Sequence, residues 1–212
     1  PKYDPLKRKI KNLLFDFGNV LIDIDLDGAY ARLESLFRKD FKREVVEKAY
    51  LDYECGRIST DLFINGILSQ CEHRVHALDV IEAWNSMLIG IPEYRLDMLD
   101  KLRLNYNVYL LSNTNALHIE WVHRHLKHVH HVEDFEKKYF DHAYYSHLVG
   151  DRKPNASFFK FVSEDSYMTP ALTLFFDDMQ ANIDTAKSLG FQTYFVKPRE
   201  EIALYLKEGG FF

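Results

Sequence analysis

The pattern of hydrophobic and polar positions divides the chain into two parts that meet near residue 105. From Asp27 to about Leu104, apolar residues recur at helical spacing and no strand-like alternation interrupts them. From about Asn105 onward, short apolar runs alternate with helical segments. Alternating strands and helices are typical of βαβ units and a mostly parallel sheet. We therefore expect an α/β fold with a helical bundle inserted after the first strand.

The first strand is predicted in the run Leu13-Leu14-Phe15, which leads directly into Asp16. A short unbroken apolar run indicates a strand that is buried on both faces. Gly18 then permits a sharp departure of the chain and a close approach to its backbone. Four later strands are expected at residues 108–111, 142–146, 172–176 and 193–196.

Five helices are predicted between residues 27 and 104. The second is expected to stop near Gly56, and Ser59 or Thr60 can cap the third. Pro92 fits the first turn of the fifth helix, which we expect to return to the core. For the same reason, Pro154 is expected to begin a helix in the second part of the chain.

Polar residues follow three of the predicted strands, at the point where each strand ends. If the strands are parallel, these ends lie on one edge of the sheet, where open α/β sheets bind their ligands. A hydroxyl, backbone N–H groups, a lysine and three carboxylates suit a phosphate, a divalent cation and a carboxylate nucleophile. The residues concerned are Asp16 after the first strand, Ser112 and Asn113 after the second, Asp177 and Asp178 after the fourth, and Lys153 between the third and fourth.

With this set of residues the chain resembles the haloacid dehalogenase-like hydrolases over nearly its whole length. Four motifs carry the resemblance, and they occur in the order typical of the family. They are Phe-Asp-Phe-Gly-Asn-Val-Leu at 15–21, Leu-Ser-Asn-Thr-Asn at 111–115, Arg-Lys-Pro at 152–154, and Phe-Asp-Asp at 176–178 with Asn182. The α-D-glucose-1-phosphate phosphatase-like subgroup is similar in these segments. The resemblance implies a Rossmann-like core formed by residues 1–26 and 96–212, and a small helical cap domain formed by residues 27–95.

The resemblance also implies a role for each matching residue. Asp16 would attack phosphorus and form an aspartyl-phosphate. Its second oxygen, the backbone carbonyl of Gly18 and the carboxylate of Asp178 would hold Mg²⁺. Lys153 would act with Asp16 as a catalytic residue, offsetting the negative charge of Asp16, Asp178 and the phosphate. Two further roles are substrate contacts. Ser112 and the backbone N–H of Asn113 would bind phosphate oxygens, and Arg57 lies where caps of this family often place a specificity loop.

Gly18 is a departure from the family pattern. Most phosphatases of the family carry a second Asp at this position, as general acid and later base. A general acid or base typically contributes about 10²–10⁴-fold to the rate, so its loss slows such an enzyme without abolishing activity. Asp23, Asp25 or a cap residue could take over the proton transfer. An acidic leaving group, such as the anomeric hydroxyl of a sugar 1-phosphate, needs the acid least.

We therefore expect a Mg²⁺-dependent phosphatase that hydrolyses a small phosphate monoester, such as a sugar phosphate like glucose 1-phosphate. A hydrolytic dehalogenase of small haloacids uses the same Asp nucleophile without a metal. The pair Asp177-Asp178 argues against this alternative, because a dehalogenase has no use for a cation site. A non-catalytic binding module on the same fold is the other alternative. A screen of phosphate esters with and without Mg²⁺ separates the three.

Composition and charge narrow the list of partners. With 212 residues, 47% of them hydrophobic, the chain can bury one α/β core with a small insert. A formal charge of −5 gives no reason to expect nucleic acid. No 18-residue apolar run is present, and two cysteines, Cys55 and Cys71, form no metal or disulfide pattern. We expect a cytoplasmic monomer with reduced cysteines that acts on a small phosphorylated metabolite, without membrane contact. The histidine-rich stretch 118–131 is interpreted as a solvated helix face and loop.

Overall fold

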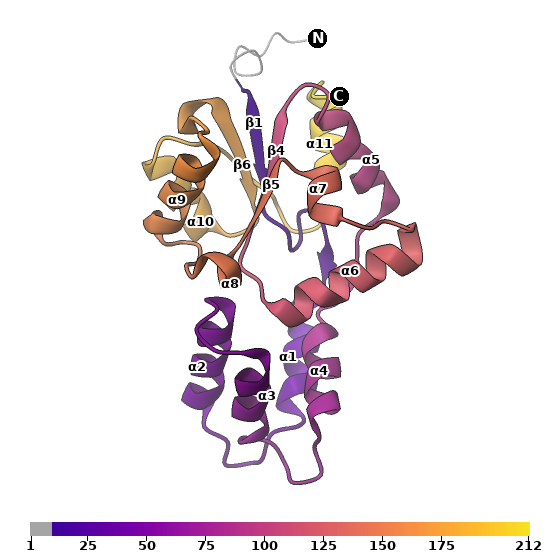
Figure 1. The fold of residues 1–212 in the computed structure, drawn as a ribbon, viewed down its shortest axis with the longest axis vertical. Coiled ribbons are helices and arrows are strands. Elements are labelled where there is room, and N and C mark those ends of the chain that lie inside the picture. Colours follow the sequence, from indigo (N-terminus) through magenta and orange to yellow (C-terminus); the bar gives the residue numbers. More distant parts are fainter. Residues whose placement is uncertain (1–9) are drawn as a thin grey trace.

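The computed structural model describes residues 10–212, and residues 1–9 of the expected core range lie outside the described residues. Five parallel strands form one sheet in the order β5-β4-β1-β6-β7 (Figure 1). The predicted parallel α/β fold is thereby confirmed, with each strand close to its expected place. The strands are β1 (Asn12–Phe15), β4 (Asn107–Ser112), β5 (His142–Tyr145), β6 (Thr173–Asp177) and β7 (Gln192–Phe195).

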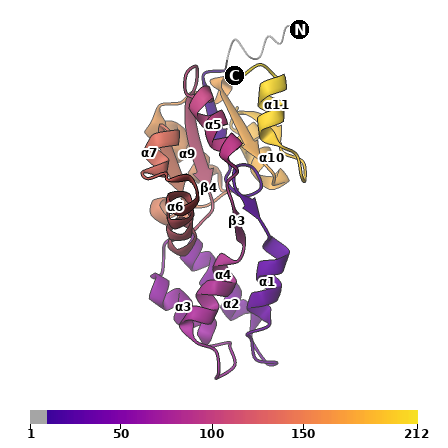
Figure 2. The same ribbon diagram turned by 90° about the vertical axis from the view of Figure 1, so that its right-hand side faces the viewer.

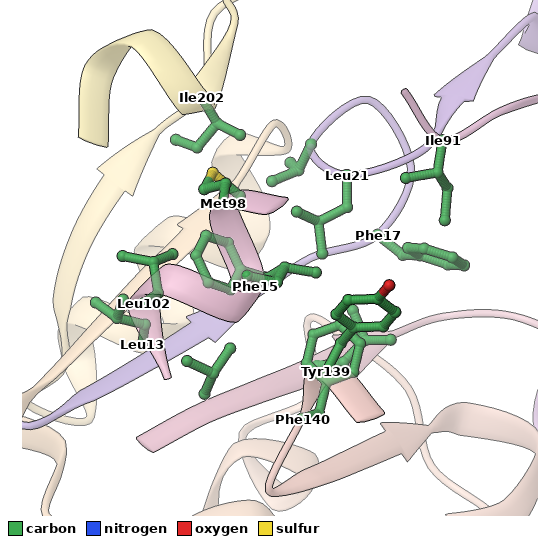
Figure 3. Close-up of a cluster of buried hydrophobic side chains, with 14 of the residues drawn as sticks. Leu13, Phe15, Phe17, Leu21, Ile91, Met98, Leu102, Tyr139, Phe140 and Ile202 are labelled. Carbon is green, nitrogen blue, oxygen red and sulfur yellow. The ribbon is translucent and has the colours of Figure 1, made fainter. Parts of the chain in front are cut away.

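Strand β1 lies in the middle of the sheet and is buried on both faces. Successive side chains of a strand point to opposite faces. Leu13 and Phe15 therefore enter one hydrophobic cluster and Leu14 enters another, and all three are fully buried. Figure 3 shows Leu13 and Phe15 in the first cluster, together with Leu102 and Ile202 from two helices. The unbroken apolar run in the sequence reflects this double burial.

Helices cover both faces of the sheet and account for the two clusters. One face packs against α5, α6, α7 and α11, and the other against α9 and α10 (Figures 1 and 2). The bounds of these helices are α5 (Glu93–Leu102), α6 (Ala116–His130), α7 (Phe135–Tyr139), α9 (Ala156–Ser166), α10 (Gln180–Ser188) and α11 (Ile202–Glu208); the short α8 (Ser146–Val149) and the 3₁₀ turn η1 (Pro170–Leu172) follow β5 and precede β6.

Four helices form a separate bundle beyond the carboxyl ends of the strands (Figure 1). We call this the cap bundle; it consists of α1 (Leu26–Glu34), α2 (Arg43–Glu54), α3 (Thr60–Leu68) and α4 (Ala77–Asn85). Its apolar faces make a hydrophobic cluster of their own, with Phe63, Val80 and Trp84 among the buried members. Ser59 caps α3 by accepting a hydrogen bond from the backbone N–H of Leu62, as the sequence predicts.

The cap bundle is joined to the sheet by a short two-stranded ribbon that the sequence did not reveal. Strand β2 (Asp23–Ile24) carries the chain out, and β3 (Leu88–Gly90) brings it back antiparallel (Figure 2). The expectation of an uninterrupted helical stretch was therefore wrong at β3. A strand of three residues paired with one of two is too short to show an alternating pattern.

Two prolines lie just before helices instead of inside them. Pro92 is the N-cap residue of α5, which begins at Glu93. Pro154 follows a cis peptide bond from Lys153, and α9 begins only at Ala156. Asn155 has an extended backbone, so the helix cannot start before it. The predicted helix is therefore present, but its predicted start at Pro154 was wrong.

The cap domain proposed at residues 27–95 can be compared with the bounds of the cap bundle and of β3, which run from Leu26 to Gly90. Helix α1 begins at Leu26, and the start of α5 falls inside the proposed range. Leu96 and Leu99 of α5 pack in the core cluster, which supports the expected return of this helix to the core.

Cys55 and Cys71 are both free and buried. No helix within residues 10–212 has the length and apolar character that crossing a bilayer requires.

Candidate active site

Three carboxylates meet at the carboxyl edge of the sheet, next to its central strand. Strands β1 and β6 are parallel neighbours with Phe15 opposite Phe176, so Asp16 and Asp177 come next to each other. One carboxylate oxygen each of Asp16, Asp177 and Asp178 lies within 4.8 Å of the other two. The convergence expected from the strand ends is therefore present.

Lys153 lies between two of these carboxylates and is almost completely buried. Its Nζ donates hydrogen bonds to Oδ1 of Asp16 at 2.7 Å and to Oδ2 of Asp177 at 2.8 Å. A third bond, at 2.9 Å, goes to the backbone carbonyl of Leu111 at the end of β4. Lys153 was expected to offset the charge of Asp16 and Asp178, and its positive charge acts on both carboxylates. Its hydrogen bond to Asp177 was not anticipated. The lysine is thus fixed by three neighbouring strands.

The electrostatics of this cluster leave an excess of negative charge. Burial, with the charge of Asp177 next in size, raises the pKa of Asp16 to about 8. Burial also raises the pKa of Asp178 above its ordinary value. For Lys153, burial acts to lower the pKa, but Asp16 and Asp177 outweigh it and raise the pKa above its usual range. Three carboxylates around one ammonium suit the binding of an additional cation.

Asp177 and Asp178 have different surroundings, and this assigns them different parts. Asp177 is fully buried, and its oxygens accept hydrogen bonds from Lys153, from the backbone N–H of Met179 and from the side chain of Asn182. Asp178 lines the pocket described below, and its Oδ2 accepts a hydrogen bond from Asn19 at 3.2 Å. Asp177 therefore holds the lysine in place, while Asp178 and Asp16 face the pocket and can ligate a metal.

Ser112 is the last residue of β4 and Asn113 follows it, and both lie in the same pocket as Asp16. The Asn113 side chain accepts a hydrogen bond from the backbone N–H of Lys153 at 2.8 Å and donates one to its carbonyl at 2.9 Å. Asn113 thereby fastens the lysine-bearing loop to the end of β4. Sequence reasoning gave a role only to its backbone N–H and missed this side-chain contact.

Gly18 leaves the pocket without a side chain at the position where the family pattern expects an acid. A Cβ at this position would lie 3.1 Å from Cδ1 of Ile24. The suggested substitutes do not replace it. Asp23 Oδ1 accepts a hydrogen bond from Arg95 at 2.8 Å, and Asp25 caps α1 by accepting from the backbone N–H of Gly28. Neither carboxylate lines the pocket, so the structure does not favour Asp23 or Asp25 as the proton donor, and a cap residue is the suggestion that stays open.

The pocket has a volume of about 440 Å³ and is closed on one side by the cap bundle. Tyr30 of α1 and Tyr50 and Glu54 of α2 line it from that side. Arg152 lines it from the core and donates a hydrogen bond from Nε to Oε2 of Glu54 at 2.5 Å. Sequence reasoning quoted Arg152 in a motif but gave it no part, and Glu54 carries no local signal that marks it as a site residue.

Arg57 was expected to contact the substrate, and the structure does not bring it into the pocket. Its side chain is 62% exposed and makes an ion pair with Asp52 at 3.4 Å, one helical turn earlier. The reason is local. Gly56 takes a left-handed conformation (φ +67°) after α2, packed closely against the carbonyl of His147. The chain then turns, and the guanidinium of Arg57 forms its ion pair with Asp52 at the surface.

His118 corrects the interpretation of the histidine-rich stretch as entirely solvated. It is buried in α6 at the edge of the pocket, stacked on Trp84 of α4. Its Nε2 lies 3.1 Å from the backbone carbonyl of Trp84, and its Nδ1 lies 3.2 Å from the amide nitrogen of Asn115. His118 thus links the core to the cap bundle, with both ring nitrogens engaged.

We expect His118 to make the fold sensitive to acid. Burial lowers the pKa of His118 to about 4, below its ordinary value of 6.5. The unfolded chain therefore takes up this proton first, and the stability is fully present above about pH 6.5 and lost progressively toward about pH 4. The full loss is about 3 kcal/mol. Urea unfolding at pH 7 and pH 4.5 should show a smaller loss in His118→Gln than in the wild type. The same substitution at the exposed His128 is the control, and equal losses in all three proteins would contradict the assignment.

Comparisons with known proteins agree with this geometry. No family model matches the chain. The chain is 32% identical over 195 residues to a D-ribitol-5-phosphate phosphatase of Bacteroides thetaiotaomicron, covering 87% of this chain and 91% of that protein. A solved structure of a HAD family enzyme from the same organism, in complex with magnesium and inorganic phosphate, is 36% identical. Its TM-score is 0.81, with 91% of this chain and 96% of that chain covered.

A HAD-like hydrolase structure from Porphyromonas gingivalis is similar to a comparable degree. It is 30% identical with a TM-score of 0.82, and the likeness covers 94% of this chain and 97% of that chain. The likeness in both comparisons extends over the sheet and the cap bundle together. The chain belongs to the haloacid dehalogenase-like family of hydrolases.

Proposed function

We propose that the protein is a Mg²⁺-dependent phosphatase that hydrolyses a small phosphate monoester through an aspartyl-phosphate. The observation that carries the proposal is the placement of Asp16. It is held by Lys153 at the floor of a pocket, with Asp178 beside it. The phosphatase named for the Bacteroides relative, and the magnesium and phosphate bound in the related solved structure, support this choice.

Mg²⁺ fits the oxygen donors that the pocket offers. Asp16, Asp178 and the backbone carbonyl of Gly18 would hold it, because a hard cation prefers carboxylate and carbonyl oxygens. When bound, the metal would neutralise charge on the phosphate and on the two carboxylates. The excess of negative charge at this edge of the sheet is what such a cation would balance.

The side chains of the protein divide the remaining work. A carboxylate oxygen of Asp16 attacks phosphorus while the bond from phosphorus to the leaving oxygen breaks, and the electron pair of that bond goes to the leaving oxygen. Lys153 keeps Asp16 oriented and offsets the negative charge around the transferred group. Ser112 and the backbone N–H of Asn113 would bind phosphate oxygens. Water then attacks the phosphorus of the aspartyl-phosphate while the bond from phosphorus to the Asp16 oxygen breaks, and the electron pair of that bond returns to Asp16. Inorganic phosphate is released, and the proton of the attacking water passes to the phosphate or to solvent.

The pocket favours a small, hydroxyl-bearing leaving group. Its volume of about 440 Å³ is closed over by the cap bundle, and Tyr30, Glu54 and Arg152 offer polar contacts within it. Sugar and polyol phosphates fit this description, including ribitol 5-phosphate by likeness to the relative and glucose 1-phosphate by the expectation from sequence. A haloacid dehalogenase, which uses no metal, would gain nothing from a second carboxylate, Asp178, facing the pocket beside Asp16.

Removal of divalent metal should abolish hydrolysis. EDTA is expected to stop turnover of an aryl phosphate and of polyol phosphates, and added Mg²⁺ should restore it. Halogenated acids should not be substrates in either condition. A panel of phosphate monoesters and haloacids, assayed for phosphate or halide release with and without Mg²⁺, tests this directly. Full phosphate release in EDTA would refute the metal requirement, and no release from any ester would refute the phosphatase assignment.

A further inference from the structure

A guanidinium is held at the cap side of the pocket by a buried carboxylate. Arg152 Nε donates to Glu54 Oε2 at 2.5 Å, and the hydroxyl of Tyr50 donates to Glu54 Oε1 at 2.9 Å. Glu54 is only 3% exposed, whereas the Arg152 side chain is 32% exposed and lines the pocket. Within residues 10–212, the two terminal nitrogens of Arg152 have no hydrogen-bond acceptor. They can therefore bind a ligand in the pocket.

The reaction geometry places the leaving oxygen on the same side as this guanidinium. In-line transfer requires the leaving group to lie opposite the attacking oxygen. Asp16 attacks from the sheet edge, so the leaving group must point toward the cap bundle. Arg152 begins beside Lys153 in the core and reaches Glu54 of α2 in the cap bundle. Its side chain therefore spans the region between the sheet edge and the cap bundle, which is the region that the leaving oxygen occupies.

Tyr50, Glu54 and His118, which also line the pocket, are already engaged in hydrogen bonds. Tyr30 lines the pocket as well, but burial raises the pKa of its hydroxyl above the ordinary value, so it gives up a proton poorly. Gly18 has no side chain, and both ring nitrogens of His118 are already engaged. The Tyr50 hydroxyl donates to Glu54, and Glu54 itself accepts from Tyr50 and Arg152. The charge that develops on the leaving oxygen needs a donor that acts without giving up its proton. A guanidinium supplies such charge-assisted hydrogen bonds, because it stays protonated throughout.

We propose that Arg152 donates a hydrogen bond to the leaving oxygen of the substrate and stabilises its negative charge as the bond to phosphorus breaks. Glu54 is the positioning residue that aims the guanidinium, with Tyr50 fixing Glu54. The electron pair of the breaking bond stays on the leaving oxygen, which then takes a proton from water. This inference rests on the proposed phosphatase function and adds a role that neither the motif nor Gly18 provides.

The test compares leaving groups of different acidity. Single-turnover rates with saturating Mg²⁺ are measured for a series of substituted phenyl phosphates and for alkyl and polyol phosphates. In Arg152→Gln, we expect the rate to fall about 10²–10³-fold for alkyl and polyol phosphates, the cost of removing one preorganised donor. For a 4-nitrophenyl leaving group, which needs little stabilisation, the fall should be below about tenfold. The plot of rate against leaving-group pKa should therefore be steeper in the variant.

Two further variants separate this role from a structural one. Glu54→Gln should make the plot of rate against leaving-group pKa steeper than in the wild type, but less steep than in Arg152→Gln. The guanidinium is still present in this variant, and only the carboxylate that orients it is lost. Arg124→Gln, an exposed ion-pair residue of α6, should leave the plot unchanged. If Arg152→Gln does not fold, Arg152→Lys takes its place, and its plot should be steeper than that of the wild type.

The outcomes distinguish this inference from the proposed function. Equal slowing of every substrate in the Arg152 variant would overturn the role of Arg152 and leave the phosphatase assignment intact. A wild-type protein that hydrolyses no ester at all would overturn the proposed function itself. A parallel plot for Glu54→Gln, with steepening in Arg152→Gln, would remove Glu54 from its positioning role.

Discussion

Asp16→Asn should remove turnover while the fold is kept. The change is nearly isosteric at the end of β1, and the amide oxygen of Asn can still accept the hydrogen bond that Lys153 Nζ gives to Asp16 at 2.7 Å. The amide is not a nucleophile, so no aspartyl-phosphate can form. A loss on the order of 10⁴-fold or more in kcat is expected for removing a covalent nucleophile.

The measurement combines kinetics with trapping of the phosphorylated state. Beryllium fluoride should add to Asp16 in the wild type, visible as density joined to the carboxylate, and should not add in Asp16→Asn. Asp184→Asn on the exposed face of α10 is the control and should retain wild-type rates. Turnover that survived in Asp16→Asn, and also in Asp16→Ala to exclude deamidation, would mean that water attacks phosphorus directly.

Lys153→Met should damage both stability and activity. Lys153 Nζ is the ammonium between Asp16 and Asp177, and the residue is only 2% exposed. Removing one member of a buried ion pair leaves uncompensated charge and typically costs about 3–5 kcal/mol. Activity should fall at least about 10²–10³-fold, because the attacking carboxylate loses its orientation and the transferred group loses a positive neighbour.

Urea unfolding with and without Mg²⁺ distinguishes the two effects. Mg²⁺ should recover part of the lost unfolding free energy in Lys153→Met, since a second cation then faces the same carboxylates. It should restore little of the activity. Lys160→Met, an exposed change in α9, serves as the control for replacing a lysine by methionine. An unfolding free energy equal to that of the wild type would show that the buried pair contributes nothing.

The part of the site at the edge of the sheet could be predicted from the sequence, because it depends on strand ends alone. Asp16, Ser112 and Asp178 each lie at or just after the end of a strand, and parallel strands bring such residues to one edge whatever the details of packing. Lys153 was expected from its motif, but its hydrogen bond to Asp177 was not. Choosing Asp177 over Asp178 requires knowing which of two adjacent carboxylates turns inward, and no periodicity reports that.

The side of the site that faces the cap bundle could not be predicted in this way. Glu54 and Arg152 are separated by 98 positions, and they meet only because α2 docks against the loop before Lys153. Arg57 was expected to contact the substrate because it follows Gly56 between two cap helices, yet the turn at Gly56 directs it to the surface. The ribbon of β2 and β3 decides how the cap bundle sits, and its few residues leave no pattern in the sequence.

The central position of β1 has a consequence for how the chain is made. Synthesis on the ribosome delivers β1 first, but its neighbours in the sheet begin only at Asn107 and Thr173. The whole cap bundle is completed in the interval, and its helices contact one another within that stretch of chain. The apolar strand β1, which leads into Asp16, thus lacks both neighbouring strands, β4 and β6, while the residues of the cap bundle are synthesised after it. The nascent chain must keep Leu13, Leu14 and Phe15 from premature association until β4 emerges.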